Sequence, residues 1–107
     1  MDIEKDVDDQ GQVAVLVSEG YGAGWSTWNG HSEFLMFDKG LVQLAIKGAK
    51  KPEVEAYLKD KLGEDAPYMG GWSGIEVHRL SPGTCFLVEE YDGWESLTLP
   101  AHLTFTA

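Results

Sequence analysis

The sequence CFLVEEYDGWESLTL at residues 85–99 determines the fold that we expect for this chain. Apolar and polar side chains alternate along much of it, which is typical of β-strands with one buried face. In its middle, Asp92-Gly93 stands between Tyr91 and Trp94, and this pair is a strong signal for a two-residue hairpin turn. The stretch therefore predicts two antiparallel strands, Cys85–Tyr91 and Trp94–Leu99.

The predicted turn also sets the pairing of the two strands. If Tyr91 pairs with Trp94, the residues opposite each other are Glu90 and Glu95, Glu89 and Ser96, Val88 and Leu97, and Phe86 and Leu99. One face, which we expect to be the core, then carries Phe86, Val88, Leu97 and Leu99. The opposite, partly polar face carries Cys85, Leu87, Glu89, Tyr91 and Trp94.

The pairing of Glu90 with Glu95 is a local inconsistency, because like charges opposite each other are unfavourable in a sheet. We expect both side chains to project into water at the tip of the hairpin. The alternative is a cation or a basic partner between them.

The chain before the hairpin predicts two further strands. The apolar, β-branched run at residues 12–18 fits a central strand that is buried on both faces. Alternation predicts another strand over residues 75–80, and Ser81-Pro82-Gly83-Thr84 after it is a type II turn signal. After Pro100, residues 103–105 form a candidate fourth strand of the C-terminal half.

Two helices are expected between these strands. Asp38 is a candidate N-cap for a helix that Gly48 ends, and Pro52 opens a second helix that Gly63 ends. Residues 33–37 are ambiguous, because the apolar run at residues 34–37 is too short to assign. We therefore predict a single α+β domain over residues 1–107, an antiparallel meander with two helices packed on one face. Residues 1–10 are expected to be a flexible acidic lead-in or an edge strand.

The charge of the chain narrows the range of partners. Eighteen acidic residues against eight Lys and Arg give a formal charge of −10. This balance argues against direct binding to nucleic acid or to an anionic membrane surface. Six lysines against three acids make residues 39–61 an exception, with a net charge of +3. An acidic surface either serves solubility or engages a basic partner.

The sequence also bears on the compartment. Cys85 is the only cysteine, so no disulfide forms within the monomer and a reducing compartment fits. The acidic residues 1–6 do not resemble a signal peptide, and no apolar run reaches membrane-spanning length. We expect a cytoplasmic protein.

Two loops rich in glycine and tryptophan are candidates for a ligand site. The first is GYGAGWSTWNG at residues 20–30, and the second is GGWSG at residues 70–74. Thr27 stands where a dinucleotide fingerprint requires glycine, and no P-loop lysine follows. A pocket between the loops would stack a flat ligand, such as a small nucleotide, on indole rings. Its candidate residues are Tyr21, Gly22, Gly24, Trp25, Ser26, Thr27 and Trp72. In the alternative interpretation these indoles cap a small core, which we favour for Trp28.

Catalytic and metal-binding signals are weak. His31, His78 and His102 are scattered without metal-ligand spacing, so neither a metal nor a cofactor is expected. Cys85 is interpreted as a packing residue. A small hydrolase would need His78 or His102 to cluster with carboxylates in one cleft, and this remains the enzymatic alternative.

The segment YGAGWSTWN at residues 21–29 resembles one found in small uncharacterised proteins of bacteriophages and prophages. Further similar pieces are Phe37-Asp38, Gly70-Gly71, Pro82-Gly83-Thr84 and Glu90-Tyr91-Asp92-Gly93. The resemblance covers most of the chain from about residue 13 onward and implies a phage accessory protein in the bacterial cytoplasm. Small acidic phage proteins of this kind often inhibit host systems, which is an argument by association.

These observations favour a non-enzymatic binding protein over an enzyme. The expected partner is a host defence factor with a basic surface, such as a CRISPR effector. The candidate partner-binding residues are Glu89, Glu90, Asp92, Trp94 and Glu95. A sponge for a nucleotide signal, the hydrolase and a structural virion component are the alternatives.

Overall fold

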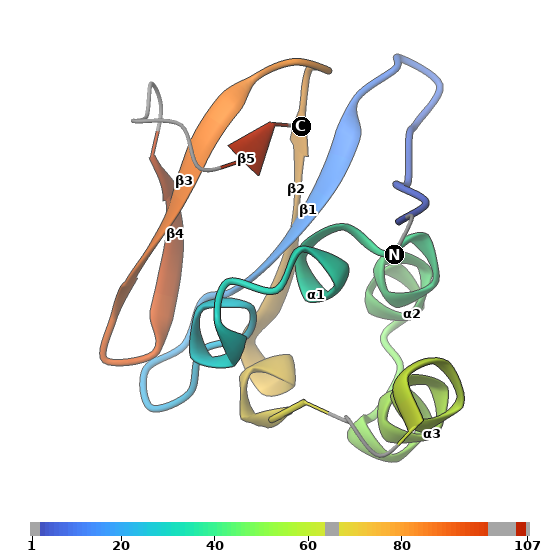
Figure 1. Ribbon diagram of the computed structural model, residues 1–107, viewed down its shortest axis with the longest axis vertical. Coiled ribbons are helices and arrows are strands. Elements are labelled where there is room, and N and C mark those ends of the chain that lie inside the picture. Colours follow the sequence, from blue (N-terminus) through green and yellow to red (C-terminus); the bar gives the residue numbers. More distant parts are fainter. Residues whose placement is uncertain (1–2, 64–66, 99–104, 107) are drawn as a thin grey trace.

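The apolar run at Val13–Ser18 forms strand β1, which lies at the centre of the computed structural model (Figure 1). The structure describes residues 3–63, 67–98 and 105–106. Every residue of β1 is buried, as the sequence predicts for a central strand. The α+β class is confirmed, with helices α1 (Glu33–Phe37), α2 (Lys39–Lys47) and α3 (Lys51–Leu62).

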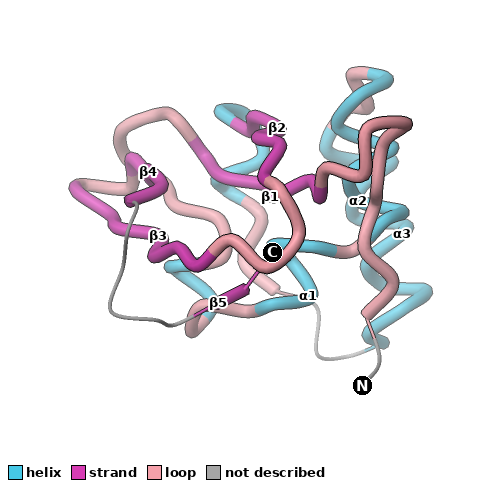
Figure 2. Tube along the Cα trace, turned by 90° about the horizontal axis from the view of Figure 1, so that it is seen from above, coloured by secondary structure: helices cyan, strands magenta, loops and turns pink. Residues whose placement is uncertain are grey.

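Strand β1 is buried on both faces because it lies between two layers. Its odd-numbered residues pack with Met36 and Phe37 of α1 and with Phe86 and Val88 of the C-terminal hairpin. The even-numbered Ala14 and Leu16 pack on the other side, against Trp25, Trp72 and the apolar residues of α2 and α3. Figure 2 shows this arrangement, with α2 and α3 on one side of β1 and the hairpin on the other.

The strands form two separate sheets, so the single meander that we predicted is wrong. Strand β2 (Ile75–Leu80) pairs antiparallel with β1, whereas β3 (Cys85–Tyr91) pairs with β4 (Trp94–Thr98) and with the short β5 (Phe105–Thr106). The predicted turn between β2 and β3 does form, because Thr84 N donates to Ser81 O over 3.1 Å and Gly83 has a φ of +83°. The turn carries the chain from one sheet to the other and does not join two paired strands.

The hairpin has the predicted register. Tyr91 pairs with Trp94, Glu90 with Glu95, Glu89 with Ser96, and Val88 with Leu97. Asp92 and Gly93 both have a positive φ, as a tight hairpin turn requires. The predicted pairing of Phe86 with Leu99 and residues 103–104 of the predicted fourth strand lie outside the described residues.

The local helix signals are also confirmed. The Asp38 carboxylate caps α2 by accepting from Leu41 N at 3.1 Å, and Gly48 ends this helix with a φ of +76°. Pro52 lies in the first turn of α3, which Gly63 ends. The ambiguous residues 33–37 form α1, capped by the hydroxyl of Ser32, so the described residues contain one α-helix more than expected.

The described part of the acidic N-terminal segment, residues 3–10, is neither a free lead-in nor a regular edge strand. Isolated bridges join Lys5 to Asp38 and Val7 to Val13. The carboxylate of Asp6 is mostly buried and forms an ion pair of 2.8 Å with Arg79 of β2. These contacts hold the segment against the domain.

Candidate functional site

Glu95 has the most unexpected environment in the hairpin. Its side chain is 0% exposed, so our expectation that it projects into water is wrong. One carboxylate oxygen, Oε1, accepts from Ser18 N at 2.9 Å. The other, Oε2, accepts from Trp25 N at 2.8 Å, from Thr27 N at 2.9 Å and from the Thr27 hydroxyl at 2.6 Å.

These four hydrogen bonds explain how a carboxylate is tolerated inside the protein. Burying a charge is costly unless it is well hydrogen-bonded, and bonds to a charged acceptor are the strong ones. Among the described residues, no Lys, Arg or His forms an ion pair with Glu95. The carboxylate instead ties the end of β1 and the first Gly/Trp loop to strand β4.

The tip of the hairpin packs on the same loop. Gly22 N donates to Asp92 O at 2.6 Å, and a side chain at Gly93 would collide with Ala23 N. Glu90 accepts from Gly93 N at 2.6 Å and remains exposed. The backbone that carries Tyr21 is therefore held from two directions, by the turn and by Glu95.

Three aromatic rings are presented at this end of the hairpin. Tyr21 is 69% exposed, Tyr91 is 77% exposed and Trp94 is 38% exposed. The ring centroids of Tyr21 and Trp94 are 5.1 Å apart. With Glu89 and Glu90, these rings line a hollow of about 180 Å³. We call the three rings together with Glu89, Glu90 and Asp92 the acidic aromatic surface.

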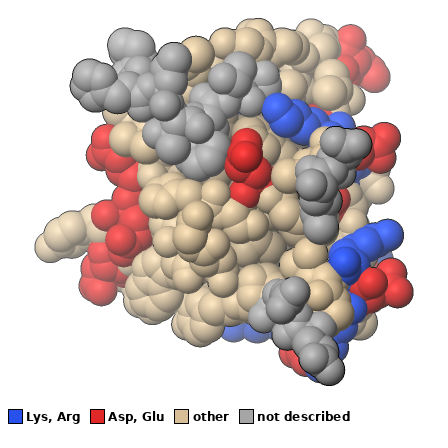
Figure 3. All heavy atoms as spheres, in the orientation of Figure 1, with Lys and Arg blue, Asp and Glu red and all other residues tan. Residues whose placement is uncertain are grey.

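This surface is strongly acidic. Its three carboxylates are exposed, and none has an ion-pair partner within residues 3–63, 67–98 and 105–106. Figure 3 shows acidic side chains along the side of the molecule where β3 and β4 lie, whereas the side of the helices carries both basic and acidic side chains. Of the predicted partner-binding residues, all except Glu95 are exposed here. Tyr91 was not among them, although the predicted register places it beside Trp94.

The predicted ligand pocket between the two Gly/Trp loops is not formed. Trp25 and Trp72 do meet, with ring centroids 5.5 Å apart, but they are 0% and 5% exposed. Their indole N–H groups donate to Leu35 O and Ala49 O. A Cβ at Gly71 would collide with the carbonyl of Gly24, so glycine there allows the loops to touch. The loops are core scaffold at these positions, whereas Tyr21 carries its ring out to the surface.

Trp28 lies on the surface, so our expectation that it caps the core is wrong. Its ring stacks on Tyr68 at a centroid distance of 5.6 Å, and both residues are exposed. The Asn29 side chain bonds both N–H and C=O of Tyr68. This second aromatic pair lies outside the acidic hollow and offers a matched control for experiments on Trp94.

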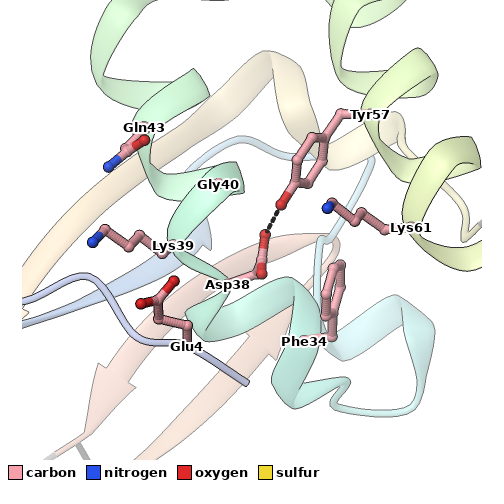
Figure 4. A pocket seen from close by; sticks show the side chains of 8 residues that line it. All are labelled: Glu4, Phe34, Asp38, Lys39, Gly40, Gln43, Tyr57 and Lys61. Carbon is pink, nitrogen blue, oxygen red and sulfur yellow. Dashed lines mark hydrogen bonds between the residues drawn. The ribbon is translucent and has the colours of Figure 1, made fainter. Parts of the chain in front are cut away.

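A separate polar cleft of about 650 Å³ lies between the N-terminal segment, α1, α2 and α3 (Figure 4). The Tyr57 hydroxyl donates to Asp38 at 2.5 Å, and Gly40 leaves room for this approach. Burial raises the pKa of Tyr57, and the hydrogen bond and the negative charge of Asp38 raise it further. Glu4, Lys39 and Lys61 also line the cleft, so it carries both signs of charge and does not select one class of ligand.

The histidines and Cys85 give no catalytic arrangement among the described residues. His78 lies 2.6 Å from a carboxylate oxygen of Glu19, and His31 contacts Val88 O at 3.3 Å. The remaining candidate, His102, lies outside the described residues. Cys85 is a half-buried free thiol beside Gly83 O. Within the described chain, no three His, Cys, Asp or Glu side chains are placed to share a metal ion.

Comparisons with known proteins give no family for this chain. No family model, no curated protein and no solved structure matches it. Among the described residues, no helix combines the length and the apolar composition that a membrane crossing requires.

Proposed function

We propose that this protein is a non-enzymatic binding protein whose acidic aromatic surface covers a basic surface of another protein. The observation that carries the proposal is the placement of three exposed rings beside three carboxylates that lack cation partners in the described chain. Aromatic side chains surrounded by charge are typical anchors of protein interfaces. Complementary charge would steer a basic partner to them.

The charge of the chain supports a protein partner over nucleic acid. Strands β3 and β4 contain no Lys or Arg, and the whole chain carries −10. A phosphate backbone would be repelled by this surface. A basic groove that normally binds nucleic acid would fit it. Together with the resemblance to small phage proteins, this favours inhibition of a host anti-phage factor, such as a CRISPR effector, in the bacterial cytoplasm.

The alternative functions have less support. A nucleotide sponge loses its main feature, because Trp25 and Trp72 are inside the core. An acid and histidine hydrolase would rest on the pair of His78 and Glu19, which lines none of the clefts described above. A virion component has no particular observation in its favour.

The proposal is tested by capture from a bacterial lysate with identification by mass spectrometry. We expect a basic protein to be retained by the wild type and by Trp28→Ala, but lost with Glu89→Lys and with Trp94→Ala. Retention should fall steeply as salt rises from about 0.05 M to about 0.5 M, because salt screens exposed charges. A protein retained equally by all four forms and insensitive to salt would refute the proposal.

A further inference from the structure

The hollow in the acidic aromatic surface has the chemistry of a cation receptor. Tyr21, Tyr91, Trp94, Glu89 and Glu90 line a space of about 180 Å³, and Glu89 shares a face of the hairpin with Tyr91 and Trp94. Aromatic faces attract cations through their quadrupole, and indole does so best. A carboxylate beside such a ring adds a direct charge and hydrogen-bond acceptors. Both kinds of group therefore favour the same occupant, a positively charged side chain.

Within the described chain, no cation already fills this role. Glu89 has no ion pair there, and Glu90 uses one carboxylate oxygen, Oε2, to accept from Gly93 N. Arg79, the only Lys or Arg from residue 64 to the C-terminus, is bound to Asp6 of the N-terminal segment, and Lys5 lies over the Phe37 ring. The six lysines of residues 39–61 belong to the helical segment. Within the described residues, the hollow therefore has no cation of its own.

The chemistry of the lining residues favours one of the two cationic side chains. The rings of Tyr21 and Trp94 are tilted by 51° with centroids 5.1 Å apart, so they present two ring surfaces at an angle. A guanidinium is planar, stacks on aromatic rings and binds carboxylates with two parallel hydrogen bonds. An ammonium is compact, strongly hydrated and lacks this planar surface. The combination of ring surface and carboxylates suits arginine better than lysine.

The receptor is also held in place before any partner arrives. The contact of Gly22 N with Asp92 O and the four bonds to Glu95 fix both ends of the segment that carries Tyr21. Preorganisation of this kind lowers the entropic cost of binding. The ring of Trp94 is carried by a paired strand residue opposite Tyr91.

We infer that this hollow binds a single arginine side chain of the basic partner. The inference rests on the proposed function, because it assigns the anchor that the partner inserts. Glu89 binds the guanidinium edge, and Trp94 stacks on its face while Tyr21, whose ring is tilted from that of Trp94, lines the same hollow. Arginine would then set the specificity of a surface that charge alone leaves open to any basic protein.

Three blocked tripeptides test the inference on the isolated protein: Gly-Arg-Gly, Gly-Lys-Gly and Gly-citrulline-Gly. Lysine matches the charge of arginine, and citrulline matches its shape without the charge. The readout is the indole N–H signal of Trp94 in a two-dimensional NMR spectrum, assigned with Trp94→Phe. We expect the arginine peptide to shift this signal and to bind about fivefold more tightly than the lysine peptide. The citrulline peptide should leave the signal unchanged.

Variants locate the binding site. Tyr21→Ala and Glu89→Gln should each weaken the arginine peptide about fivefold or more, whereas Trp28→Ala should not change its affinity. Equal shifts by arginine and citrulline, or shifts at Trp28 in place of Trp94, would overturn the inference.

A pair of longer basic peptides separates this inference from the proposed function. If lysine-rich and arginine-rich peptides bind the surface equally and with the same salt dependence, the arginine receptor is wrong and the proposed function stands. If neither peptide binds at low salt, both proposals fail.

Discussion

Replacing Glu95 by glutamine tests whether the buried carboxylate holds the Gly/Trp loop. Glutamine keeps the shape but has one acceptor oxygen, so its NH₂ group must face a donor. If the NH₂ takes the place of Oε1, the N–H of Ser18 loses its acceptor. A buried donor without a partner costs about 1–3 kcal/mol.

The remaining bonds change as well. The hydrogen bonds from Trp25 N, Thr27 N and the Thr27 hydroxyl would become weaker, because their acceptor would be a neutral amide oxygen in place of a charged carboxylate oxygen. The lower cost of burying a neutral amide offsets part of this loss. We therefore expect Glu95→Gln to lower the free energy of unfolding by about 2–3 kcal/mol, a large part of the typical stability of a small domain.

Urea unfolding followed by tryptophan fluorescence measures this effect. The matched control is Glu89→Gln, the same chemical change at an exposed position on the facing strand, which should stay within about 0.5 kcal/mol of the wild type. Hydrogen exchange adds a local readout, because the amides of Ser18, Trp25 and Thr27 should lose protection in Glu95→Gln. Equal stability of the two variants, with unchanged protection at these amides, would refute the role assigned to the carboxylate.

Three further predictions concern other parts of the molecule. Gly71→Ala should destabilise the fold by about 2 kcal/mol or more, because the added methyl group would collide with the Gly24 carbonyl. Gly20→Ala should be tolerated, because the nearest atom to its added methyl group is 3.9 Å away. Urea unfolding of both variants measures the difference. Since the pKa of Tyr57 is raised in the folded state, the unfolded chain loses this proton first, and stability should fall as pH rises above about 10, the ordinary pKa of tyrosine. Tyr57→Phe should make that alkaline decrease shallower, and identical pH dependence of the urea midpoint in both forms would contradict the assignment. Thr27→Val should destabilise by about 1–2 kcal/mol through loss of the hydroxyl bond to Glu95, and a double-mutant cycle with Glu95→Gln should show that the two effects are not additive.

The elements that could be predicted from sequence are those whose signals are local. Asp92-Gly93 sets both the turn and the register of β3 with β4, and Asp38 and Gly48 mark the ends of α2. The separation into two sheets could not be predicted, because the turn at residues 81–84 has the same local signature whether or not its flanking strands pair. Which strands become neighbours depends on β1, which is distant in the chain from β2.

The candidate site was also predicted only in part, because some of its contacts depend on residues that are distant in the chain. The register already places Glu95 on the face of Val88 and Leu97, and this was a usable sign that it points inward. Its donors, however, come from Ser18, Trp25 and Thr27, about seventy residues away, and no spacing rule connects them. Likewise, the Gly/Trp composition marks two shaped loops but does not reveal that Trp25 and Trp72 turn inward while Tyr21 turns outward.

The position of β1 has a consequence for folding of the nascent chain. Ser18 pairs with Ile75, so the sheet partner of β1 is synthesised only after the whole helical segment. The hairpin that covers its other face comes later still. Until then, a β-branched apolar strand lacks both its pairing edge and one of its two packing layers, which is the condition under which chains aggregate. The central strand that gives the finished protein its core would therefore also make folding slow, because folding must wait for this long-range pairing. It would also make the chain depend on chaperones during synthesis.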